Sequence, residues 1–162
     1  MWTSISIYNI SVKVFHHIGD RMTIEQLKTL KQIVKKDMTI DPKDPHIMEV
    51  LCDSTLHHSK LYHRYVDLFT VESRKLKKLK ADKVKKYGEL YHHYKFEGDF
   101  KLDTKGEIDA YIGANKEYYD LILKFNDQEI VCQFLDKTLD NINNMKWNVK
   151  NYLEYKKFLS GE

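Results

Sequence analysis

One uninterrupted segment governs the architecture of this chain: Ser54–Tyr94 reads STLHHSKLYHRYVDLFTVESRKLKKLKADKVKKYGELYHHY. It contains no proline, and its one glycine is Gly88. Apolar residues recur in it every eleven residues, a period of about 3.67 residues per turn. This period predicts a long helix that is nearly straight or slightly right-handed in its supercoil. The recurring positions are Tyr65, Leu76 and Tyr87, and then Leu68, Leu79 and Leu90.

Charged residues occupy a third position of the same repeat. Glu72 and Lys83 stand eleven residues apart, and Tyr94 follows at the next equivalent place. A charge within an apolar stripe can fix the register between two packed helices. The same residues could instead lie in water at the edge of the stripe, so the pattern leaves both roles open.

The composition predicts an all-α fold class. The 162 residues include six glycines and two prolines, which is too little turn chemistry for a sheet of many strands. We expect shorter amphipathic helices on both sides of the long central one. Thr23 with Gln26 and Thr104 with Glu107 match the capping box that begins a helix. The expected helices cover residues 23–36, 46–52, 54–94, 104–125, 128–144 and 148–160, with a connector at 37–45 and a turn at 96–100.

The chain is predicted to consist of an extension and one domain. Its first residues alternate like a β-strand, but no partner strand follows, and a lone strand is not stable. We therefore expect residues 1–21 to be an N-terminal extension, poorly ordered or untranslated, with Met22 as the biological start. Residues 22–162 then form a single helical domain. Within it, 22–100 hold the basic long helix and 101–162 hold the C-terminal helices.

Missing motifs argue against an enzyme. The sequence has neither a G-x-x-x-x-G-K-[ST] loop nor a G-x-S-x-G elbow. Cys52 and Cys132 match no paired metal spacing, so we expect free thiols in a reducing cytosol. The histidines between His57 and His93 lack the i, i+4 pairing of a zinc-binding helix face. We predict no metal ion and no cofactor, and no apolar run is long enough to span a membrane.

Positive charge is concentrated in the second half of the long helix. Segment Val71–Lys95 holds nine Lys or Arg against three Asp or Glu, which is nine minus three or +6, whereas the whole chain carries +3. At about 100° per residue, part of this charge lies opposite the leucine stripe and forms a linear face. Such a face suits the phosphate backbone of a nucleic acid, although a merely solvated face would look the same. Its residues are Arg74, Lys78 and Lys85, with Lys77 beside them.

Aromatic side chains accompany these cations. Unstacked bases stack on aromatic rings, so the combination favours single strands over duplex. No motif for reading a duplex sequence is present. Aromatic residues at helical spacing can also belong to the core. The residues concerned are Tyr62, Tyr91, Tyr94 and Phe96.

Five segments follow one another in a characteristic order. They are MTIEQL at 22–27, DMTID at 37–41, LHHSKLY at 56–62, YHHY at 91–94 and VKNYLEYKKFLSG at 149–161. In this order they resemble the UvsY family, the recombination mediators of T-even-like bacteriophages. The resemblance implies a protein without enzymatic turnover that binds single-stranded DNA in the cytoplasm of the infected bacterial host. It also implies two protein partners, since such a mediator weakens complexes of the phage single-stranded-DNA-binding protein and loads a RecA-like recombinase of the UvsX type.

The resemblance further implies a ring-type homo-oligomer, a hexamer or heptamer, formed through the C-terminal helices. The cleanest amphipathic pattern of that region lies at residues 128–144. Its apolar side chains could contact neighbouring subunits or form an intramolecular core, and the pattern is consistent with both. The candidates are Ile130, Val131, Phe134, Leu135, Leu139 and Ile142.

The sequence departs from the family in one motif. The family carries a Leu-Lys-x-Arg-Leu type motif whose basic residues help to hold DNA. Leu79, Lys80 and Ala81 match its beginning, but Asp82 stands where the arginine would fall. If the later tyrosines set the alignment instead, the motif falls near residues 88–90 and is lost. Lys80 is carried over as a DNA contact from the resemblance under the first alignment, whereas the other four cations rest on the helical projection.

A structural coiled-coil oligomer is the competing interpretation. The eleven-residue repeat alone would be enough for such a scaffold, which would assemble without binding DNA. A protein that only docks an acidic partner is a third interpretation.

Overall fold

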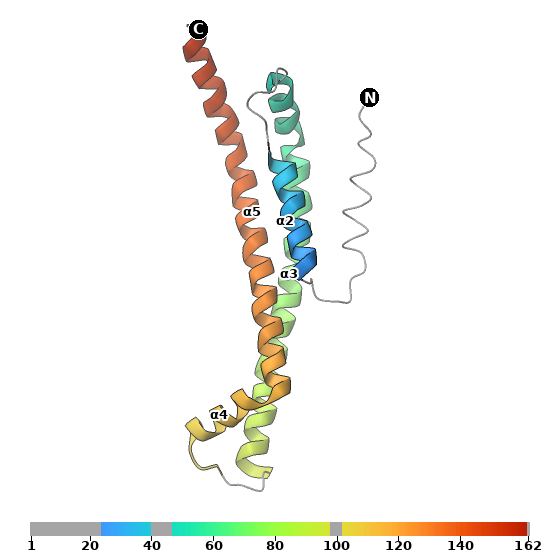
Figure 1. Ribbon diagram of the computed structural model, residues 1–162, viewed down its shortest axis with the longest axis vertical. Coiled ribbons are helices and arrows are strands. Elements are labelled where there is room, and N and C mark those ends of the chain that lie inside the picture. Colours follow the sequence, from blue (N-terminus) through green and yellow to red (C-terminus); the bar gives the residue numbers. More distant parts are fainter. Residues whose placement is uncertain (1–23, 40–46, 98–101, 162) are drawn as a thin grey trace.

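The structure is a computed structural model that describes residues 24–39, 47–97 and 102–161. These ranges contain helices and no strand, so the predicted all-α class is confirmed (Figure 1). The predicted N-terminal extension, 1–21, and most of the predicted connector lie outside the described residues. The elements are α2 (Ile24–Met38), α3 (Ile47–His92), the π-helical turn η1 (His93–Glu97), α4 (Lys105–Ala114) and α5 (Lys116–Ser160).

Helices α3 and α5 form a long antiparallel pair, with α2 beside them and α4 at one end (Figure 1). Lys86 of α3 is paired with Glu117 near the start of α5. Far along the pair, a ring nitrogen of His58 lies 2.7 Å from the carbonyl oxygen of Ile142. The contacts move backwards along α3 as they move forwards along α5, which defines the antiparallel direction.

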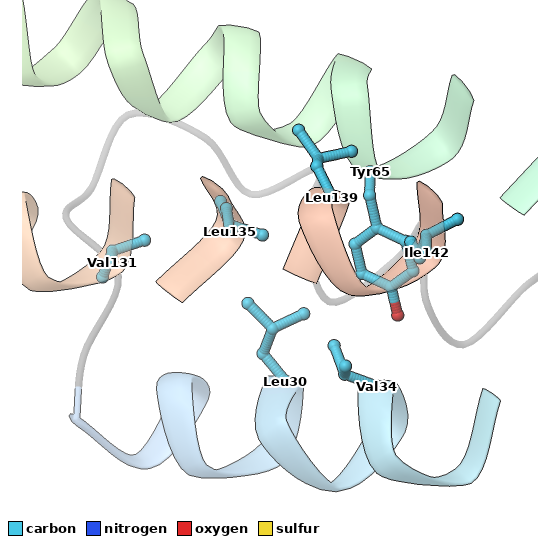
Figure 2. Close-up of a cluster of buried hydrophobic side chains, with 7 residues drawn as sticks. All are labelled: Leu30, Val34, Tyr65, Val131, Leu135, Leu139 and Ile142. Carbon is cyan, nitrogen blue, oxygen red and sulfur yellow. The ribbon is translucent and has the colours of Figure 1, made fainter. Parts of the chain in front are cut away.

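The main core lies where α2, α3 and α5 meet (Figure 2). Each helix contributes side chains from one face, and burial of each large apolar side chain contributes about 1.5–3 kcal/mol. This shared core fixes α2 against the long pair. Its buried members are Leu30, Val34, Tyr65, Val131, Leu135, Leu139 and Ile142.

A second, smaller core joins α4 to the end of α3. Leu90 packs with Ile108 and Ile112, all three buried. Helix α4 begins at the predicted capping box: the Thr104 hydroxyl accepts from the Glu107 amide at 3.3 Å, and the Glu107 carboxylate accepts from the Thr104 amide at 3.2 Å. The backbone N–H groups of Thr104 and Glu107 are thereby satisfied.

The eleven-residue repeat faces the interior, as predicted. Tyr65 and Leu90 are buried, and the other apolar members of the repeat are partly buried. The charged position lies inside as well, since Glu72 is 2% exposed. The Gln128 amide of α5 donates to the Glu72 carboxylate at 2.7 Å and to its backbone carbonyl at 3.1 Å. Of the two roles left open for Glu72, the structure supports the one that sets the register between helices.

Several predicted helix boundaries were wrong. No break separates residues 46–52 from 54–94, because α3 is continuous from Ile47. The helix expected at 104–125 is interrupted at Asn115, whose extended backbone (φ −68°, ψ 121°) ends α4 and whose side chain caps α5.

The single helix α5 covers the second half of the helix expected at 104–125 together with the two helices expected at 128–144 and 148–160. Asn141, Asn143 and Asn144, at the end of the helix expected at 128–144, are exposed within α5. Each asparagine lowers helix stability by only about 0.7 kcal/mol or less relative to alanine, so burial of the opposite face outweighs their poor helix propensity. The end predicted at residue 160 is confirmed, since α5 ends at Ser160 and Gly161 caps it in the left-handed conformation (φ 75°).

Candidate nucleic-acid interface

Exposed cations line the side of α3 that faces away from α5. They are exposed because the apolar stripe of the same helix, including the partly buried Leu76 and Leu79, packs inward. All the side chains predicted to contact DNA are on the surface. They are Arg74, Lys77, Lys78, Lys80 and Lys85.

Four of these cations follow one line. Measured from Arg74 at about 100° per residue, Lys78 is displaced by about 40°, Lys85 by about 20° and Lys77 by about 60° in the opposite sense. Arg74 and Lys85 are separated by about 16 Å along the axis. We call Arg74, Lys77, Lys78 and Lys85 the basic face. Lys80 projects about 120° from Arg74, on the flank of the helix beside the apolar stripe.

Other basic residues of the same segment hold α3 in place instead. Lys75 lies 2.9 Å from the buried Glu72 carboxylate, and the Lys83 ammonium lies 4.2 Å from the centre of the Phe125 ring of α5. Lys86 donates to Glu117, and this hydrogen bond raises the pKa of Lys86 and lowers that of Glu117. These three cations therefore belong to the internal structure.

The basic face is largely unneutralised. Within the part of the chain that the structure describes, Arg74, Lys77 and Lys78 have no ion-pair partner, and neither has Lys80. Lys85 approaches Glu89 at 3.8 Å, with both side chains exposed. Such a pair is worth about 0–1 kcal/mol and exchanges readily for another anion. A row of available cations on a rigid helix can bind successive phosphates of one strand.

The aromatic residues divide between core and surface. Tyr62 packs against the main core, and Tyr91 and Tyr94 pack against the second core. For these three the core interpretation is correct. Phe96, in the turn η1, is 66% exposed. It is the only one of the four rings that projects mainly into solvent.

The predicted oligomerisation residues also divide. Val131, Leu135, Leu139 and Ile142 are buried in the main core of their own chain (Figure 2), which is the intramolecular role that the pattern left open. Phe134 is partly buried against that core. Ile130 is 51% exposed and accessible to another subunit.

The pattern did not single out the exposed end of α5. Beyond Ile142 no residue of α5 is buried, and this end of the helix stands apart from α2 and α3 (Figure 1). Trp147, Tyr155 and Phe158 are all more than half exposed there. They fall within about 80° of one another around the helix. Their spacing of eight and then three residues is the signal in the sequence that could have identified this face.

The described ranges contain no cluster of His, Cys, Asp or Glu that could hold a metal ion. Among the histidines, the Nδ1 atoms of His92 and His93 contact the Glu97 carboxylate at 3.2 and 3.3 Å. No helix in these ranges is long and apolar enough to cross a membrane.

The fold and the basic face together define an elongated all-helical protein with a surface suited to a polyanion. The family model described as "Recombination, repair and ssDNA binding protein UvsY" matches residues 33–162. The chain belongs to this family, the UvsY-type recombination mediators.

Solved structures show the same fold. Three crystal forms of the recombination mediator protein UvsY of bacteriophage T4 match, with TM-scores of 0.70, 0.67 and 0.66 for lattice types II, IV and I. The sequence identities are 20%, 17% and 18%, over 83%, 82% and 80% of this chain and 97%, 97% and 98% of the other. No curated protein sequence matches the chain.

Proposed function

We propose that the protein binds single-stranded DNA along the basic face and, as a homo-oligomeric ring, acts on two phage proteins. It weakens the complex of DNA with the single-stranded-DNA-binding protein, and it loads a RecA-like recombinase of the UvsX type. The observation that carries the proposal is the row of exposed cations on α3, of which Arg74, Lys77 and Lys78 have no ion-pair partner among the described residues. The work is done by binding, without enzymatic turnover, in the cytoplasm of the infected bacterial host.

The interaction with DNA is mainly electrostatic. Each phosphate that a lysine or arginine neutralises releases condensed counterions, and this release favours binding at low salt. The basic face reads no base edge, so the protein accepts any sequence. Lys80 extends the contact to the flank of α3, where the family motif places one basic residue.

A ring suits this chemistry. Each subunit supplies a modest contact, and several subunits on one strand raise the overall affinity while each contact still exchanges. Exchange is what a mediator needs, because the recombinase must replace it. The exposed end of α5 and the partly accessible side chains of the predicted set, Ile130 and Phe134, supply surface for contacts between subunits.

The test is fluorescence anisotropy with a labelled oligonucleotide, single-stranded and duplex, at two or more salt concentrations. We expect a preference for the single strand and a log affinity that falls with log salt by roughly 0.7 per phosphate contacted. The double variant Lys77→Ala/Lys78→Ala reduces both the affinity and this slope. Lys137→Ala, which removes an exposed charge from α5, is the matched control and leaves both unchanged.

A second assay follows the mediator step. Recombinase assembly on DNA covered with the single-stranded-DNA-binding protein is measured with and without the mediator. The wild-type chain accelerates assembly, and Lys77→Ala/Lys78→Ala does so less. An oligomeric protein that binds no DNA at low salt would instead favour the scaffold interpretation.

A further inference from the structure

We propose that Phe96, positioned by His92, is a stacking site for an unpaired base at the end of the basic face. The inference rests on the proposed binding of single-stranded DNA and adds a contact to the bases. Its occupant is a base of the same strand whose phosphates lie on Arg74, Lys78 and Lys85.

The position of His92 on α3 brings this site into line with the cations. His92 follows Arg74 by five whole turns and Lys85 by seven residues, so the three side chains project within about 20° of one another. Along the axis His92 stands about 10 Å beyond Lys85. A strand that follows the basic face towards α4 therefore reaches His92 next.

Phe96 is in direct ring contact with His92, the residue that continues the line of cations. The centres of the His92 and Phe96 rings are 5.1 Å apart, with an angle of 48° between the planes. Phe96 as a whole residue nevertheless remains 66% exposed. It contributes little to either core, in contrast to Tyr91 and Tyr94. The π-helical turn that carries Phe96 is a rare local geometry that often occurs at functional sites.

The charges around the ring suit a nucleotide. The Lys95 ammonium lies 5.4 Å from the centre of the Phe96 ring and 5.5 Å from that of Tyr91, where it can meet the phosphate next to a stacked base. The Glu97 carboxylate is an opposing charge. It is engaged by the Nδ1 atoms of both His92 and His93.

Stacking on one phenyl ring needs no particular base, because every base has a π-face. The contact therefore fits a protein that accepts any sequence. It also strengthens the preference for single strands, since the bases of a duplex are already stacked on one another.

The test measures how two substitutions of Phe96 change the affinity for two DNA ligands. Phe96→Leu keeps an apolar side chain without the ring, and Phe96→Trp keeps an aromatic ring. Anisotropy is measured with an ordinary single strand and with an abasic strand of the same length. We expect Phe96→Leu to weaken binding of the ordinary strand by about fivefold or more. Phe96→Trp binds that strand like the wild type. Both variants bind the abasic strand as tightly as the wild type does.

Lys78→Ala separates this inference from the proposed function, because it weakens binding of both ligands. Unchanged binding by Phe96→Leu beside a weakened Lys78→Ala would overturn the stacking site alone. An equal loss on the abasic strand, or failure of Phe96→Trp to bind, would overturn it too. A wild-type protein that binds neither ligand would overturn the proposed function as well. Circular dichroism and sedimentation verify that each variant keeps its helices and its assembly.

Discussion

Glu72 shows how a single residue sets the alignment of two long helices. Its carboxylate lies in the interface of α3 and α5, where it accepts from Gln128 at 2.7 Å and from Lys75 at 2.9 Å. No buried side-chain nitrogen or oxygen of the described residues lacks a hydrogen-bond partner. Sliding α5 by one turn would leave Glu72 buried without Gln128, a costly arrangement that disfavours other registers.

This role predicts how substitutions of Glu72 and Gln128 change the free energy of unfolding. Gln128→Leu removes one partner of the buried carboxylate and lowers the free energy of unfolding by about 1–3 kcal/mol. The double variant Glu72→Leu/Gln128→Leu removes both partners and recovers most of that loss. Urea unfolding followed by circular dichroism measures all three proteins. A double variant less stable than Gln128→Leu would contradict the register role.

At the scale of elements, the sequence predicted the long helix best. The eleven-residue repeat placed the inward stripe of α3 correctly, and the five cations predicted to contact DNA lie on the surface, whereas Lys75, Lys83 and Lys86 are partly buried. The division of those cations could not be predicted, because the partners of Lys83 and Lys86 are Phe125 and Glu117 on another helix. The junction at Asn115 was missed because the apolar pattern continues across it, and its one signal in the sequence is an asparagine that can cap a helix, as the Asn115 side chain does for α5.

The start of α4 predicts a dependence on pH. Hydrogen bonds from Thr104 lower the pKa of the Glu107 carboxyl. A depressed pKa in the folded state means that the capping box stabilises the protein above the ordinary pKa of glutamate and that this contribution is lost as the pH falls. Thr104→Ala therefore lowers the melting temperature at pH 7, and the difference from wild type shrinks in acid. Calorimetry from pH 7 to pH 3 tests this, with Thr70→Ala on the exposed side of α3 as the control. A difference that does not change with pH would contradict it.

At the scale of the whole molecule, the two ends of the helical pair differ in character. One end is closed by α4 and the second core, whereas α5 extends beyond the main core at the other end (Figure 1). A row of exposed aromatic residues on that extension is surface suited to another subunit. Tyr155 and Phe158, which is 80% exposed, are prominent members.

The extension predicts a change in assembly. Tyr155→Ser/Phe158→Ser reduces the mass of the oligomer in sedimentation equilibrium while the helical content stays that of the wild type, because these side chains contribute nothing to the buried cores. Tyr119→Ser, an exposed tyrosine near the start of α5, is the control and leaves the mass unchanged. An unaltered mass for the double variant would place the contacts between subunits elsewhere, with Ile130 as the next candidate.

The continuity of α5 has a mechanical consequence. Its 45 residues form one rod of about 68 Å, braced over much of its length by α3. A rod turns a small rotation at one end into a large displacement at the other, here about 1 Å for each degree. If subunits are joined at the free end of α5, a tilt of a few degrees there moves the α4 end by a few ångströms. In the proposed ring, such tilting would change the grip on a bound strand while every helix stays folded.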